Sequence, residues 1–279
     1  MAAIELNESN LACLAPRAMD CHKGQLGHAV ILAGAPGMGG AGLLAAQTCL
    51  RLGAGLVSLL TSPEHVAASL ARQPEVMVHG VTGLGQLQPV LQQATVLLLG
   101  PGIGRATTAS KMLQQAAALP VPQIWDADAL NLLASHPDDF AAEGVRILTP
   151  HPGEAARLLN RSVAEVQADR EQAALQLARQ YNSLVVLKGF GSLIAAPEGQ
   201  LLVCRRGHPV MAGPGFGDVL GGAIVALLAQ GMAPLDATCL AVWLHARAGE
   251  LLSGEGRGAV ASDLLVPMRS LLQDWSPVT

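Results

Sequence analysis

Residues 28–52 read HAVILAGAPGMGGAGLLAAQTCLRL, and this stretch indicates the class of fold. His28–Ala33 is a short apolar run of the length of a buried strand, while Gly42–Leu52 has the apolar spacing of a helix. A glycine-rich turn joins the two. A strand that leads through such a turn into a helix is the repeating unit of an α/β fold.

The same alternation continues along most of the chain. Further buried strands are expected at Gly55–Thr61, Thr95–Leu99, Val121–Trp125, Val145–Leu148 and Ser183–Leu187, and further helices at Thr107–Ala118, Val163–Tyr181, Gly217–Gln230, Pro234–Leu252 and Ser262–Gln273. Within Leu193–Arg205, two short runs flank Pro197-Glu198-Gly199 and predict a hairpin at the sheet edge. The pattern predicts one α/β domain over residues 1–279, with a mainly parallel central sheet and helices on both faces.

Composition excludes several classes of protein. The 279 residues carry a net charge of −4, which does not favour a nucleic-acid partner. No apolar run reaches the roughly 20 residues of a membrane span, and none near the start has signal-peptide length. The five cysteines lack CxxC spacing and suit reduced thiols, so a cytoplasmic protein is expected.

Glycine-rich turns follow two of the predicted strands. Gly34–Gly42 contains a GxGxxG match, but the dinucleotide-binding interpretation also needs an acidic residue after the second strand, where Thr61 stands. Gly100–Gly104 reads GPGIG. Both turns allow a ligand to approach the backbone, and both also suit a tight turn without a ligand.

Two other strand-end loops carry acidic residues or histidine. Asp126 and Asp128 follow the strand that ends at Trp125, and they suit a metal, a water or a ligand hydroxyl, or an N-cap by Asp128. In LTPHPGE, two prolines hold the backbone around His151, which favours a ligand contact. Glu154 suits either the following helix start or a metal.

The remaining strand-end and helix-start motifs point to phosphate. Lys188 ends a strand and precedes Gly189 and Gly191, a pattern that suits phosphate binding. The turn Ala212–Asp218 reads AGPGFGD and leads into an apolar helix, so its amides form an anion site and Asp218 stands in the first helical turn. Amides for phosphoryl charge beside a carboxylate base are what phosphoryl transfer needs.

Together these motifs resemble the NAD(P)H-hydrate dehydratase family, within the ribokinase-like superfamily. The matching pieces run in the family's order from His22 to Asp263: HKGQLG, GAGLLAA, GPGIG, DADALN, LTPHPGEAARLL, VVLKG, GDVLGG with LLAQG, and LHARAGE. The resemblance implies a ribokinase-like fold and a lyase that uses ADP or ATP to dehydrate the S-epimer of NADH hydrate and NADPH hydrate, with the nucleotide converted to AMP or ADP plus phosphate.

The resemblance also implies roles for individual residues. Asp218 would be the catalytic base. The hydrated dinucleotide would contact Ala41, Gly102, His151 and Asp218, and the nucleotide would contact Lys188, Gly189, Phe190, Gly191, Ser192 and Gly217. Further candidates are Gly104, Asp126, Asn131, Glu154 and Gly215.

The family resemblance further implies Mg²⁺, without an assigned ligand, and a homotetramer. The epimerase domain that is often fused ahead of this one is not expected, so a separate epimerase would act with this chain. Family members often read GNPGMATGGTGDVL in the segment that includes Gly217 and Asp218. This chain departs from that pattern at His208, Pro214 and Phe216. Proline removes an amide donor, and Phe216 is expected to crowd the phosphate.

Three other functions fit parts of the sequence. A kinase for a small alcohol, such as a thiazole or a pyrimidine, would share the GxGD turn but would match DADALN and the His151 loop less well. A nucleotide-binding regulatory protein would tolerate Pro214 and Phe216, but it would not need Asp218. A Rossmann oxidoreductase would need an acidic residue after the second strand, where this chain has Thr61.

Overall fold

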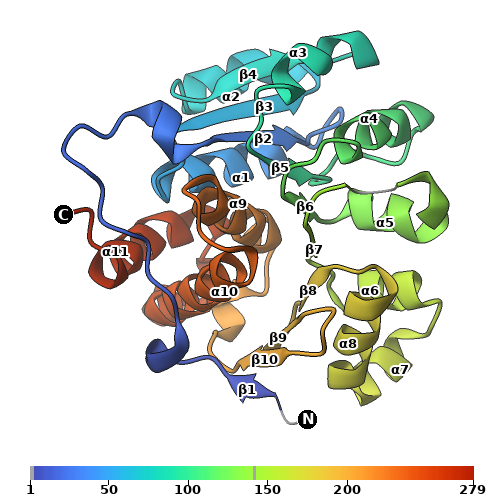
Figure 1. Ribbon diagram of the computed structural model, residues 1–279, viewed down its shortest axis with the longest axis vertical. Coiled ribbons are helices and arrows are strands. Elements are labelled where there is room, and N and C mark those ends of the chain that lie inside the picture. The colour runs from blue at the N-terminus through green and yellow to red at the C-terminus, as the bar shows by residue number, and fades with distance from the viewer. Residues whose placement is uncertain (1–2, 141–142) are drawn as a thin grey trace.

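A ten-stranded sheet forms the centre of the computed structural model, which describes residues 3–140 and 143–279 (Figure 1). The strands follow the order β1-β10-β9-β8-β7-β6-β5-β2-β3-β4 across the sheet. They are β1 (Ile4–Glu5), β2 (His28–Leu32), β3 (Leu56–Thr61), β4 (Met77–Gly80), β5 (Val96–Leu99), β6 (Gln123–Trp125), β7 (Arg146–Leu148), β8 (Leu184–Leu187), β9 (Ser192–Ala195) and β10 (Leu201–Cys204).

The strands from β8 to β4 pair in parallel; the apolar runs predicted all of them except β4, which sequence analysis missed. These strands are apolar because helices cover both faces. Strands β8, β9 and β10 pair antiparallel, which confirms the hairpin around residues 197–199. The hairpin is not the edge, however, because β1 pairs in parallel outside β10. A strand of two residues has no periodicity that the sequence could have revealed.

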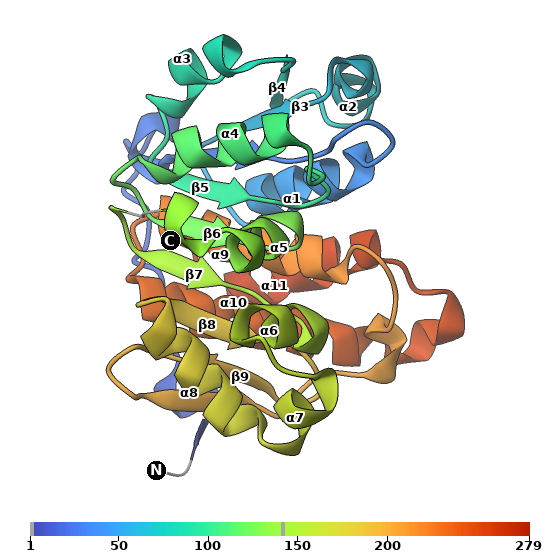
Figure 2. The ribbon, with the colours of Figure 1, turned by 90° about the vertical axis from the view of Figure 1, so that its right-hand side faces the viewer.

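Eleven α-helices occur in the described residues and form two layers. In Figure 2, α4, α5, α6 and α8 lie in front of the strands, while α1, α10 and α11 lie behind them. The helices are α1 (Gly39–Arg51), α2 (Val66–Arg72), α3 (Gln88–Leu91), α4 (Thr107–Ala117), α5 (Asp128–Ser135), α6 (Pro152–Leu159), α7 (Val163–Ala168), α8 (Arg170–Gln180), α9 (Phe216–Ala229), α10 (Pro234–Leu251) and α11 (Leu265–Trp275).

Each layer of helices has its own apolar core. Alternate residues of a strand face opposite cores: Ile31 of β2 packs with α1 and α9, whereas Val30 and Leu32 pack with α4 and α5. Helices are therefore present on both faces of the sheet, as predicted. No helix in the described parts of the chain is long and apolar enough to cross a bilayer.

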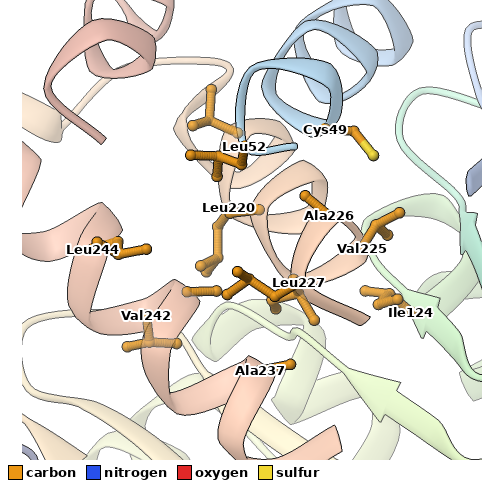
Figure 3. Close-up of a cluster of buried hydrophobic side chains, with 14 of the residues drawn as sticks. Cys49, Leu52, Ile124, Leu220, Val225, Ala226, Leu227, Ala237, Val242 and Leu244 are labelled. Atoms are coloured by element: carbon orange, nitrogen blue, oxygen red, sulfur yellow. The ribbon is translucent and has the colours of Figure 1, made fainter. Parts of the chain in front are cut away.

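Helix α9 is buried along most of its length. Its apolar sequence has no polar face, and it packs between α1, α10 and the sheet. Gly222 allows α1 to approach closely, because a Cβ there would overlap the carbonyl oxygen of Ala45. Figure 3 shows this cluster, with Cys49, Leu52, Ile124, Leu220, Val225, Ala226, Leu227, Ala237, Val242 and Leu244 labelled.

One predicted helix is divided in two. The stretch Val163–Tyr181 forms α7 and α8, which meet at Asp169. The Asp169 side chain accepts a hydrogen bond from the Gln172 amide at 3.0 Å and so begins α8. The apolar spacing continues across this break, which is why the sequence predicted one helix.

Candidate active site

The chain reverses its direction of winding between β2 and β5. It runs from β2 through β3 to β4 and then returns to the other side of β2. Ligands of open parallel sheets bind beyond the carboxyl ends of the strands at such a switch point. The glycine-rich turns after these two strands meet there, where the Gly34 amide donates to the Pro101 carbonyl at 2.9 Å.

The two residues expected to contact the dinucleotide at this point lie together. A Cβ built on Gly102 would be 3.5 Å from the Cβ of Ala41 and 2.9 Å from that of Met38. Gly102 also has φ +58°, which disfavours a side chain. Glycine at position 102 therefore allows this turn to pack closely against the start of α1.

A partly buried ammonium with three carboxylates near it lies beyond β6, β7 and β8. The Lys188 Nζ is 2.6 Å from Asp126 Oδ1 and 3.9 Å from Glu154 Oε2. A Cβ on Gly217 would lie 3.4 Å from Lys188 Nζ and 3.7 Å from Asp126 Oδ2. Asp218 follows Gly217 in the first turn of α9, as predicted. Six of the predicted residues thus gather around one point: Asp126, His151, Glu154, Lys188, Gly217 and Asp218.

Burial and mutual repulsion shift the titration of this group. Burial, together with the charge of Asp126, raises the pKa of Asp218 to about 7. Burial also raises the pKa of Glu154 to about 7. Although burial of the Lys188 ammonium favours loss of its proton, the carboxylates of Asp126 and Glu154 outweigh it and raise the pKa of Lys188. Near neutral pH the site therefore holds a charged lysine beside carboxyl groups that can take up protons.

His151 has a structural role in addition to any ligand contact. Its Nδ1 accepts hydrogen bonds from the amides of Gly153 and Glu154, at 2.9 and 3.3 Å, and so caps α6. Glu154 Oε2 in turn accepts from the His151 amide at 2.8 Å, which completes a capping box. Burial lowers the pKa of His151, so its ring is neutral and carries its hydrogen on Nε2.

Asp128 and Asn131 join three segments at the mouth of the site. The Asp128 carboxylate does not cap α5; it accepts from the Gly104 amide at 2.9 Å and lies 3.4 Å from the Arg105 Nε. Asn131 accepts from the Arg157 Nε at 2.7 Å and is buried. This chain of contacts brings Arg157, which sequence analysis did not single out, close to His151.

The glycine-rich turn before α9 corrects the expectation for Phe216. Its ring is only 5% exposed and packs in the core beneath Gly213, so it does not crowd a phosphate. As the first helical residue, Phe216 points its side chain inward while its carbonyl accepts from the buried His245 Nε2 at 2.9 Å. Gly215 precedes it at φ +86°, the left-handed region that glycine tolerates.

The loop between β8 and β9 holds the other predicted nucleotide contacts. Gly189 and Gly191 have φ values of +138° and +67°, and the Ser192 hydroxyl donates to the Gly189 carbonyl at 3.0 Å. Phe190 is 85% exposed. Arg170 of α8, which no motif pointed to, contacts this loop from behind. A contact between residues about 20 positions apart leaves no signal in local sequence pattern.

Comparison with known sequences identifies one family. The family model for NAD(P)H-hydrate dehydratase matches residues 29–268. A bifunctional NAD(P)H-hydrate repair enzyme from Vibrio cholerae is 46% identical over 93% of this chain and 52% of that protein, so the chain spans about half the length of this relative. An ADP-dependent (S)-NAD(P)H-hydrate dehydratase from Neisseria meningitidis is 38% identical over 91% of this chain and 88% of that protein.

Solved structures give the same result for the fold. An ADP/ATP-dependent NAD(P)H-hydrate dehydratase from Bacillus subtilis, co-crystallised with ATP and Mg²⁺, superposes with a TM-score of 0.87 at 28% identity. The match covers 99% of this chain and 100% of that one. A ribokinase-like protein from Enterococcus faecalis gives a TM-score of 0.88 at 26% identity, over 98% of this chain and 96% of that one. The fold is therefore ribokinase-like.

Proposed function

This chain belongs to the NAD(P)H-hydrate dehydratase family, and we propose that it restores NADH and NADPH from the S-epimers of their hydrates, with ADP as the phosphoryl donor. One observation carries the proposal: Asp218 stands in the first turn of the buried helix α9, beside a lysine held by Asp126 and Glu154. That arrangement offers a base and an anion site at one point.

The reaction proceeds by phosphorylation and elimination. Asp218 takes the proton of the hydroxyl on the hydrated ring, and this oxygen attacks the β-phosphorus of ADP, so AMP leaves. The amides at the start of α9 and the Lys188 ammonium balance the charge that develops on the phosphoryl oxygens. Phosphate then leaves the ring with its oxygen, a ring proton is lost, and the double bond of the dihydronicotinamide is restored.

The residues around Lys188 also fit a magnesium ion carried by the nucleotide. Mg²⁺ is commonly held by one or two carboxylates together with substrate phosphates and water. Asp126 and Glu154 supply such carboxylates, and no group of three or more His, Cys, Asp or Glu in the described residues forms a protein-only metal cage. Bound there, Mg²⁺ would neutralise phosphate charge.

The remaining parts of the proposal rest on the family. The Vibrio cholerae relative is a bifunctional NAD(P)H-hydrate repair enzyme of about twice this length, and we propose that an epimerase supplies the S-epimer to this chain. We also propose a homotetramer, which light scattering of the purified protein tests directly. The five free cysteines suit a reducing compartment, which supports a cytoplasmic location.

The test is the recovery of NADH absorbance from purified NADH hydrate with Mg²⁺ and either ADP or ATP. Asp218→Ala should lose nucleotide-dependent recovery by at least a hundredfold. Asp236→Ala is the matched control, because Asp236 also occupies the third position of its helix, α10, but is exposed. No recovery by folded wild type with either nucleotide contradicts the proposal, and phosphorylation of a thiazole or pyrimidine alcohol instead would make the protein a small-molecule kinase.

A further inference from the structure

Four backbone carbonyls, one at the end of β8 and three in the loop between β8 and β9, converge on one guanidinium. Arg170 Nη1 donates to the Phe190 carbonyl at 2.8 Å, and Nη2 donates to those of Leu187, Lys188 and Gly191 at 3.2, 3.3 and 3.3 Å. We propose that Arg170 is a positioning residue, which holds this loop in the shape that binds the phosphates of the nucleotide. The inference rests on the proposed function and names the residue behind its nucleotide site.

The loop and the guanidinium are fitted to each other. A Cβ on Gly189 would lie 3.0 Å from Arg170 Nη1 and 3.1 Å from Nη2, so only glycine allows this approach without displacement. Arg170 Nε is buried and has no hydrogen-bond partner in the described residues, which leaves the guanidinium's bonding to its two terminal nitrogens. Only a planar fork reaches several carbonyls at once in this way.

The direction of the carbonyls decides where the amides point. In a trans peptide the C=O and the N–H point in opposite directions, so the amides of Gly189 and Gly191 face away from Arg170. Neither amide donates a hydrogen bond within the described parts of the chain, whereas the Lys188 amide donates to the Pro150 carbonyl at 2.8 Å. Two amides that face away from the guanidinium are thus free to donate hydrogen bonds to an anion.

Most contacts of Arg170 are separate from those that build the sheet. Strands β8 and β9 pair through Val185, Val186 and Leu187 with Ala195, Ile194 and Leu193. These pairs are buried, and among them the guanidinium contacts the carbonyl of Leu187, where β8 ends; its other three contacts lie in the connecting loop. Loss of the fork should therefore alter the loop and its ligand while the strands stay paired.

The test measures nucleotide binding apart from turnover. Arg170→Met and Arg170→Lys are compared with wild type by calorimetric titration of ADP and of ATP, and by steady-state kinetics for both substrates. We expect the Kd and the KM for the nucleotide to rise at least tenfold in both variants, with kcat and the KM for NADH hydrate within about threefold of wild type. Lysine keeps the charge but cannot form the fork, so it should restore little of the affinity.

Arg179→Met is the matched control, because Arg179 is an exposed residue of the same helix. A nucleotide affinity within twofold of wild type in Arg170→Met overturns the inference. So does an equal rise in both KM values with a collapse of the melting temperature, which would mean a global structural role. Wild type that binds neither nucleotide overturns it as well, whereas wild type that binds ADP without dehydrating the hydrate contradicts only the proposed function.

Discussion

At the scale of single residues, the site depends on carboxyl groups that lie beside a charged lysine. Asp218 must be ionised to accept the proton of a hydroxyl, yet burial and Asp126 raise its pKa to about 7. Part of the protein is then protonated at Asp218 and inactive at neutral pH. The pKa of Glu154 is also raised to about 7, so the pKa values near neutrality belong to the coupled group.

The pH profile of activity tests this argument. We expect kcat/KM for NADH hydrate to rise from pH 6 to pH 8, with a fall of about tenfold per pH unit on the acid side. Asp126→Asn removes the neighbouring negative charge and should move this limb to lower pH, because the pKa of Asp218 then falls. An activity that declines as pH rises through this range would show that Asp218 acts in its protonated form.

At the scale of elements, the position of α9 relative to α1 places the anion site. Gly222 is the contact that sets this distance, since an added Cβ would overlap the backbone of Ala45 rather than a movable side chain. A shift of α9 would also move Gly217 and Asp218, which stand one turn earlier on the same helix. The packing of two helices is therefore part of the geometry of the site.

Substitution of this glycine tests the packing. Gly222→Ala should lower the free energy of unfolding by about 1–3 kcal/mol, even though alanine has a higher helix propensity than glycine. Gly40→Ala in α1 is the control, because an added Cβ there meets nothing within 4 Å and should stabilise by up to about 1 kcal/mol. Urea unfolding measures both, and equal effects of the two substitutions would contradict the packing argument.

At the scale of the whole molecule, the site joins segments from most of the chain. Lys188 follows β8, Asp126 follows β6, and Gly217 lies in the first turn of α9, so a nucleotide bound among them connects elements that are far apart in sequence. A ligand that binds only the folded state stabilises it by RT ln(1 + [L]/Kd). Binding should therefore raise the stability of the entire fold.

Thermal unfolding with ADP tests this connection. At a hundred times its Kd, ADP should stabilise the protein by about 2.7 kcal/mol, measured as a rise in melting temperature. Gly217→Ala should keep the ligand-free melting temperature but lose most of the rise, because its Cβ would enter the space beside the Lys188 ammonium. A full ADP effect in this variant would place the nucleotide elsewhere.

The sequence by itself determined the parallel sheet, its two helical layers and the loops that carry the site. Apolar runs of strand length that are followed by glycine-rich turns are compatible with few other folds. The motifs after β6, β7 and β8 lie side by side because these strands are neighbours in the sheet. The short strand β1, the break at Asp169 and the inward direction of Phe216 did not follow from local pattern.

Only the tertiary structure decided how the charged groups meet. Lys188 and Asp126 are 62 residues apart in sequence, and the pairing of β8 through β7 to β6 brings them within 2.6 Å. Arg170 is likewise assigned to its loop by the packing of α8 against β8 and β9. Strand order and helix packing set these distances, and burial in the folded state shifts the pKa values, so neither can be read from residue types along the chain.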